Sequence, residues 1–299
     1  MRLNNRVISL KIDVDTYQEM ERGVPVLLEI LKKYDIKATF FLSFGPDNSG
    51  KAVWNIFRKK GFLSKMLRTG APRMYGMKTM LYGTLLPAPI IASALPRIVN
   101  SIRKDGHEIG VHAWDHRLWQ DNLGKLSEGR VKDEFEKSFN AFSSILGSEP
   151  EATAAPAWFC NLTSLKIQDS LNLEYSSDTR GRLPFYPRIN GETLNTLQIP
   201  TNQPCIEELI GLDLVDINNL VEEQISFLMN NAPSISAVHA EVEGNIYKDE
   251  FDQFLKKTIS SGYEYTPLNV IAKSFYDAPI RDINYKYIFG RSGLVSSSI

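Results

Sequence analysis

The first part of the chain alternates between apolar segments with β-forming residues and one amphipathic helical segment. Residues 7–14 and 37–43 are rich in apolar and β-branched side chains, which predicts two buried strands. Between them, residues 21–34 place apolar side chains from Val24 to Leu31 at the spacing of one helical face. A β-α-β start of this kind implies parallel neighbouring strands joined by a right-handed crossover, which favours an α/β fold.

The same alternation resumes after residue 104, with helical patterns over 127–146 and 251–259 and a strand near 235–240. With 299 residues, the chain is long enough for one large domain or two ordinary ones. The pattern predicts a single α/β barrel-like domain over residues 1–299, with polar residues at the carboxyl ends of strands, where such barrels hold their active sites. The polar residues from about 281 onward are expected to form a loosely held tail.

The overall composition excludes several classes of protein. A net charge of −1 does not favour nucleic acid as a partner, and no protein partner is evident. The two cysteines, Cys160 and Cys205, are too few for a disulfide framework and are expected to be free thiols in a reducing compartment. Lys11 and Asp13 interrupt the N-terminal apolar segment too early for a signal peptide, so we expect a cytoplasmic protein.

Three of the four histidines lie in one stretch, residues 105–116. Residues 109–111 predict a short buried strand, and His112 and His116 follow it four positions apart. If the chain turns helical after the strand, this spacing puts both imidazoles on one side, as a metal-binding pair requires. The HxxxH pattern by itself is a weak signal, because two unrelated polar residues often have the same spacing.

Two further polar motifs end predicted strands: Asp13 and Asp15 close the first, and His239 closes a late one. Together with the histidine pair, they resemble the polysaccharide deacetylase family (NodB type, carbohydrate esterase family 4), whose fold is a distorted (β/α) barrel. Within it, four segments resemble the branch of 4-deoxy-4-formamido-L-arabinose-phosphoundecaprenol deformylases: residues 12–16, 45–48, 112–116 and 238–244.

The resemblance implies a role for each of these residues. Asp15, His112 and His116 match the ligands of one divalent metal ion, and Zn, Mn and Co all suit such mixed ligands. Asp13 matches the general base that takes a proton from the attacking water. His239 matches the general acid, which is needed because an amine is a poor leaving group as an anion.

Other residues are candidates for contacts with the substrate. A backbone N–H of the turn at residues 156–158 matches a donor to the developing oxyanion. Glu241 and Glu243 alternate with His239 and so share its face. Asp178 is expected to adjust His239, and two arginines are expected either to grip a phosphodiester or to lie in a solvated loop. The substrate-binding candidates are therefore Trp158, Asp178, Arg180, Arg182, Glu241 and Glu243.

Residues 48–104 form an insertion with eleven lysines and arginines and no acidic residue. Residues 79–96 carry no charge and approach the about 20 residues of a membrane span, but three prolines argue against a transmembrane helix. An ordinary helical excursion with a solvated basic face is one interpretation. The favoured one is an insertion into the interface of an anionic membrane. The expected membrane contacts are Trp54, Arg58, Lys59, Lys60, Lys65 and Arg68.

The resulting prediction is a metal-dependent deformylase that releases formate from an undecaprenyl-phosphate-linked 4-formamido sugar. The resemblance places it peripherally on the cytoplasmic side of the inner membrane, in lipid A modification and polymyxin resistance. The main alternative is a related amidohydrolase that acts on a soluble N-acylated sugar. Two weaker alternatives are a non-haem iron oxygenase, which uses a similar ligand set on a different fold, and a binding protein that has lost its chemistry.

Overall fold

The computed structural model describes residues 6–52, 78–211, 216–288 and 293–298, and its centre is a parallel sheet. The strands β1 and β2 are buried along their whole length, as expected when helices cover one side of a sheet and a closed interior covers the other. The predicted α/β barrel fold is confirmed. The strand order is β10 (Glu264–Tyr265), β1 (Val7–Val14), β2 (Thr39–Ser43), β3 (Glu108–Ala113), β4 (Ala152–Thr153), β5 (Tyr175–Ser176) and β8 (Leu197–Gln198), with β9 (Ser234–His239) also paired to β1.

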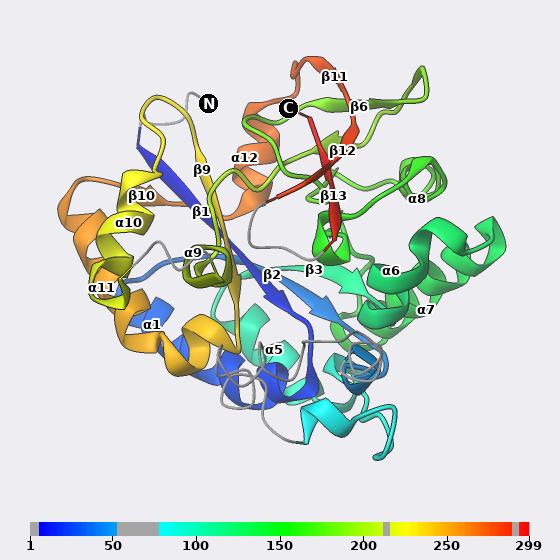
Figure 1. Cartoon of the computed structure of the whole chain (residues 1–299), viewed down its shortest axis with the longest axis horizontal. Coiled ribbons are helices and arrows are strands. Elements are labelled where there is room, and N and C mark those ends of the chain that lie inside the picture. Colours follow the sequence, from blue (N-terminus) through cyan, green and yellow to red (C-terminus); the bar gives the residue numbers. More distant parts are fainter. Residues whose placement is uncertain (1–5, 53–77, 212–215, 289–292, 299) are drawn as a thin grey trace.

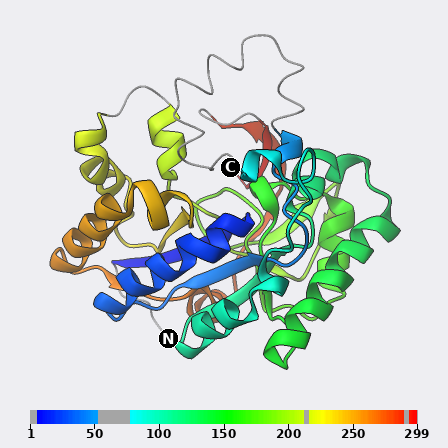
Figure 2. The same cartoon turned by 90° about the horizontal axis from the view of Figure 1, so that it is seen from below.

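Helices connect the strands and surround the sheet (Figures 1 and 2). The longest of them, α7, begins after the N-cap Ser127, whose side chain accepts from Arg130 N–H, and ends at Gly147, where φ is +71°. A glycine adopts this left-handed backbone conformation without strain, which explains the stop. The helices are α1 (Val24–Lys33), α5 (Pro96–Lys104), α6 (His116–Asn122), α7 (Glu128–Leu146), α8 (Leu162–Asp169), α9 (Ile206–Gly211), α10 (Leu220–Ser226), α11 (Lys248–Ser260) and α12 (Leu268–Ser274).

The alternation of side chains along β1 separates the core from the site. Ile8, Leu10 and Ile12 pack with the apolar faces of α1, α5, α7 and α11 in the main hydrophobic cluster. Because successive strand residues point to opposite sides, Lys11 and Asp13 face the other way, toward the barrel interior. The interior side is therefore where charged groups of this strand can meet those of its neighbours.

The segment after β8 brings the two ends of the sheet together. The Asn202 side chain accepts from Ile235 N–H at 2.8 Å and donates to the Pro233 carbonyl at 2.9 Å, while its own N–H donates to the Ile235 carbonyl. An asparagine side chain here does the work of ladder hydrogen bonds between β8 and β9. This contact closes the barrel on the side where the strands are short.

Two expected boundaries are wrong. The residues from about 281 onward do not form a loose tail where the structure describes them. Their strands pair with β6 and with each other, and Val295, Ser296 and Ser297 are buried. The expected insertion also ends before α5, which is an ordinary crossover helix with Val99 and Ile102 in the core. The additional strands are β6 (Tyr186–Ile189), β7 (Glu192–Thr193), β11 (Ile280–Asp282), β12 (Asn284–Tyr287) and β13 (Leu294–Ser297).

Candidate active site

Asp15, His112 and His116 lie together at the carboxyl ends of β1 and β3. Asp15 directly follows β1, His112 lies in β3, and His116 begins α6. The start of α6 is defined by Asp115, whose side chain caps the helix by accepting from Leu118 N–H. The distance from Asp15 Oδ1 to His112 Nε2 is 3.1 Å, and Asp15 Oδ2 lies 3.2 Å from His116 Nε2.

The hydrogen bonds of this triad fit a bound cation. His112 Nδ1 lies 2.8 Å from the Ala154 carbonyl oxygen, which can only accept, so Nδ1 donates this hydrogen bond. His112 Nε2, the other ring nitrogen, faces Asp15 Oδ1. Asp15 Oδ1 is buried and has no hydrogen-bond partner among the described residues. A carboxylate oxygen and an imidazole nitrogen about 3 Å apart are what a single ion with bonds of about 2.1 Å would hold.

The charge state of Asp15 is also suitable for a ligand. Burial by itself would raise the pKa of this carboxyl group. The neighbouring imidazoles, first His116 and then His112, more than offset this effect and hold the pKa of Asp15 well below its usual value. Asp15 is therefore ionised at neutral pH.

Asp13 and His239 stand side by side, since they are direct partners in the parallel register of β1 and β9. Both side chains are almost completely buried. Asp13 Oδ2 accepts a short hydrogen bond from Lys11 Nζ. Asp13 Oδ1 is buried and has no hydrogen-bond partner within the part of the chain that the structure describes. One carboxylate oxygen is thus engaged, and the other is available to a substrate or water.

Glu207, at the start of α9, contacts His239 and was not predicted from the sequence. Its Oε1 lies 2.7 Å from His239 Nδ1. Burial would lower the pKa of His239, but the carboxylates of Glu207, Asp15 and Asp13 together raise this pKa to about 10. His239 therefore carries a proton at neutral pH, which the role of an acid requires.

The turn at Pro156–Trp158 is strained and lies beside this pair. Ala157 and Trp158 have φ values of +56° and +51°, which are uncommon for residues other than glycine and often occur at functional sites. Within the turn, Trp158 and Phe159 donate their N–H groups to carbonyls. Pro156 has no N–H, so the half-buried Ala157 is the residue of this turn whose N–H is left for an oxyanion. The Trp158 ring is buried, and it meets the His239 ring edge-on at 6.3 Å.

The expected substrate contact of Asp178 needs correction, and so does that of Arg180, which is described in the next paragraph. Asp178 is fully buried: one oxygen accepts from Ala155 N–H and the other from Gln168 and Gln198. It therefore anchors the loop that precedes Pro156 and cannot touch a substrate. Its expected adjustment of His239 is not supported either, since Asp178 is absent from the main causes of the His239 pKa shift.

The two arginines differ from each other. Arg180 is buried, pairs with Glu208 at 2.9 Å, donates to the Gln203 carbonyl and lies over the Trp158 ring. This side chain supports the wall of the site, because its donors are already engaged by the protein. Arg182 is exposed, so a contact with a phosphate group stays a prediction.

Glu241 and Glu243 have different environments. Glu243 is buried and accepts from the backbone N–H of His239 at 2.9 Å, while burial and the charge of Glu207 raise its pKa to about 8. It holds the backbone of His239 in place. Glu241 is half-buried and hydrogen-bonds to Glu19, and burial raises the pKa of both groups. Glu19 also accepts from the backbone N–H of Asp15, so this pair supports the end of β1 that carries Asp15.

A close approach of two backbone turns makes the Glu19–Glu241 contact possible. A Cβ atom on Gly23 would lie 2.1 Å from the Ala240 carbonyl oxygen, and one on Gly244 would lie 2.7 Å from the Gly23 carbonyl. No side chain fits at either position without displacing backbone. Both glycines therefore allow the segments that carry the two acids to touch.

The expected membrane contacts Trp54, Arg58, Lys59, Lys60, Lys65 and Arg68 lie outside the described residues. The segment that follows them exposes two neighbouring leucines: Leu85 is 72% exposed and Leu86 37%. Backbone hydrogen bonds from Asp47 to Pro89 and from Ile91 to Gly45 tie this segment to the loop after β2. The leucines therefore belong to the end of the barrel where the triad lies. None of the helices in the described parts of the chain is long and apolar enough to cross a membrane.

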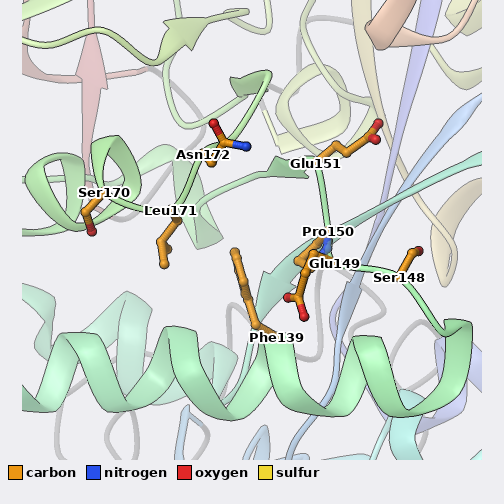
Figure 3. A pocket seen from close by; sticks show the side chains of 8 residues that line it. All are labelled: Phe139, Ser148, Glu149, Pro150, Glu151, Ser170, Leu171 and Asn172. Carbon is orange, nitrogen blue, oxygen red and sulfur yellow. The ribbon is translucent and has the colours of Figure 1, made fainter.

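A cavity of about 530 Å³ lies at the opposite end of the sheet and is separate from these groups. Its wall includes Glu151, which precedes β4, and Figure 3 shows the Phe139 ring rising from α7 between Pro150 and Leu171. It contains none of the residues described above. The cavity is lined by Phe139, Ser148, Glu149, Pro150, Glu151, Ser170, Leu171 and Asn172.

Comparison with known proteins gives consistent results. A family profile described as polysaccharide deacetylase matches residues 2–176. A Shewanella sediminis protein is 34% identical over 97% of this chain and 93% of its own length, and one of Wigglesworthia glossinidia brevipalpis is 35% identical over 92% and 96%. Both are named "Probable 4-deoxy-4-formamido-L-arabinose-phosphoundecaprenol deformylase ArnD".

Solved structures share the fold at low sequence identity. A Mycobacterium smegmatis protein described as a polysaccharide deacetylase superposes with a TM-score of 0.64 at 14% identity, covering 96% of this chain and 97% of its own. The peptidoglycan deacetylase PdaC of Bacillus subtilis superposes with a TM-score of 0.53 at 16% identity, covering 92% of this chain and 94% of its own. These likenesses concern the fold alone.

Proposed function

The chain belongs to the polysaccharide deacetylase family, and from this premise we propose that it is a metal-dependent deformylase. The family and the relatives show that the protein is a hydrolase of carbon–nitrogen amide bonds. The proposed substrate is the formamide of 4-deoxy-4-formamido-L-arabinose linked to undecaprenyl phosphate. The observation that carries the proposal is the triad in which His112 and His116 direct ring nitrogens at the two oxygens of Asp15.

The residues of the triad fit a divalent cation such as Zn, Mn or Co. Held by Asp15, His112 and His116, such an ion would polarise the formamide oxygen and make a nearby water more acidic. The protein then has to remove a proton from the attacking water and to orient the formyl carbon. Asp13 Oδ1 suits the first task because it is buried and not already hydrogen-bonded to a described residue.

His239 supplies the second proton transfer. The amine of the product leaves the tetrahedral intermediate easily only if its nitrogen is protonated. The raised pKa keeps His239 protonated, and its register position next to Asp13 supports a role for both residues at the same reacting group. The N–H of Ala157 is the backbone donor proposed to stabilise negative charge on the oxygen. Formate and a free 4-amino sugar are the products.

The lipid-linked substrate requires the site to reach a membrane surface. The exposed Leu85 and Leu86 lie at the end of the barrel that carries the triad, and residues 48–104 are rich in cations. Both features suit a peripheral contact with an anionic bilayer. We infer that the protein works on the cytoplasmic side of the inner membrane, and that its product serves lipid A modification and polymyxin resistance.

The direct test is formate release from the lipid-linked formamido sugar presented in anionic liposomes. We expect formate release by the metal-loaded protein, loss of activity after chelation, and recovery when a divalent ion is restored. A soluble N-acetylated oligosaccharide is the matched substrate for the alternative function. Acetate release from that compound, with no formate from the lipid-linked one, would replace the proposal with a soluble-sugar amidohydrolase.

A further inference from the structure

Lys11 is a fully buried lysine in the middle of the central strand β1. Its ammonium group donates to Asp13 Oδ2 and lies 5.4 Å from the centres of both the Phe41 and Trp158 rings. A lysine is rarely fully buried, because its charge loses the hydration of bulk water. Such a position therefore needs a specific partner, and the main partner is the carboxylate of Asp13.

The two oxygens of Asp13 are not equivalent. Oδ2 is engaged by Lys11, whereas Oδ1 is buried and bonded to no described residue. A carboxylate that swings about its side-chain torsion would expose either oxygen in turn. The ammonium group of Lys11 stops this exchange, and the Phe41 and Trp158 rings hold the ammonium group itself by cation–π attraction.

We propose that Lys11 is a positioning residue that holds Asp13 with Oδ1 directed at the attacking water. This inference rests on the deformylase function proposed above. Lys11 does not touch the substrate; it acts through the base. Since it affects the proton transfer and not the binding of the sugar lipid, its loss should lower kcat and leave KM nearly unchanged.

The test compares Lys11→Met, which keeps an unbranched side chain one atom shorter and removes its charge, with Lys11→Arg, which keeps a cation. We expect Lys11→Met to lower kcat for formate release by about 10²-fold, the scale of general-base catalysis, with KM within about 2-fold of the original protein. Lys11→Arg should recover at least about a tenth of the original kcat. Metal content should stay the same in both variants.

Lys33→Met is the matched control, because Lys33 also pairs with an aspartate, Asp252, but on the exposed surface. Its kcat should not change. In an Asp13→Asn background, adding Lys11→Met should cause no further loss of kcat, since the residue to be positioned has been disabled.

Several outcomes would overturn the inference: an unchanged kcat in Lys11→Met, an additional loss in the Asp13→Asn background, or a loss of bound metal. If Lys11→Met does not fold, Lys11→Gln takes its place, and equal kcat in Lys11→Gln and Lys11→Arg would reject the need for a cation. If the original protein releases acetate from the soluble sugar and no formate, the deformylase proposal fails. The kcat of each Lys11 variant relative to the original protein, measured for acetate release, then decides the role of Lys11. Absence of any hydrolysis by the metal-loaded original protein would reject both.

Discussion

Two clusters of this protein combine histidine with carboxylate, and their chemical composition alone does not tell them apart. One is Asp15 with His112 and His116. The other is Glu207 with His239 and the buried Cys205. In each cluster, the potential ligand atoms lie within 4.8 Å of one another. By residue type, the second set would suit zinc at least as well as the first, because thiolate and imidazole are good zinc ligands.

The distances separate the two. Asp15 lies 3.1 and 3.2 Å from its histidine nitrogens, but Glu207 lies 2.7 Å from His239 Nδ1. Two ligands with bonds of about 2.1 Å to one ion stand roughly 3 Å apart or more, whereas 2.7 Å is the length of a charge-assisted hydrogen bond. The comparison therefore favours the first cluster for the proposed metal ion and the second for the proposed acid.

The largest effect is expected from Asp15→Asn. This change removes the only carboxylate of the triad, so bound metal should be lost and formate release should fall by about 10³-fold or more. Metal analysis and activity are measured on the same sample. His107→Gln is the control, since His107 is a buried histidine that accepts from Ala38 N–H. Retention of one full equivalent of metal by Asp15→Asn would remove the distinction between the clusters.

A smaller effect is expected from Glu207→Gln, which should keep its metal and lose about 10- to 10²-fold in kcat. Glu207 is the strongest of the groups that raise the pKa of His239 to about 10, while burial opposes them. An acid must be protonated to act, so activity falls as pH rises through this pKa. In the variant the pKa is lower, and the alkaline limb of the pH–rate profile should move to lower pH. A limb that stays in place would show that Glu207 does not tune the acid.

The smallest effect is expected from Cys205→Ala. If the second cluster binds a proton and not an ion, the protein should hold one metal ion per chain. Removing the thiol should then leave the stoichiometry at one ion, and kcat should stay within about 2-fold of the original value. Equilibrium dialysis against zinc gives the stoichiometry. Two ions in the original protein and one in Cys205→Ala would mean that Cys205, Glu207 and His239 also form a metal site.

Much of this architecture follows from local patterns along the chain. The alternation of helical and strand periods predicted the barrel, and each motif stood at the end of a strand. Parallel strands end at one edge of a sheet, so Asp13, Asp15, His112, His116 and His239 were expected to meet there, and the structure brings them together. Lys11 is visible in the sequence as a charged residue within the apolar segment at residues 7–14, but its partner Asp13 and its ring contacts are evident only in the structure. Polarity alone does not predict the ordered segment at residues 281–288 and 293–298, because strand pairing and buried side chains such as Val295 hold it in place.

The remaining features depend on contacts between distant segments. Glu207 lies in a short acidic helix start that resembles any solvated surface, and it meets His239 only because the segment after β8 crosses to β9. The same polar loop buries Asp178 and pairs Arg180 with Glu208, although both had been expected to face a substrate. Local periodicity sets which residues lie at a strand end, because it depends on the backbone repeat alone. Which carboxylate receives a proton, a cation or a lysine is set by distances of a few tenths of an ångström, and those arise only when the whole barrel packs.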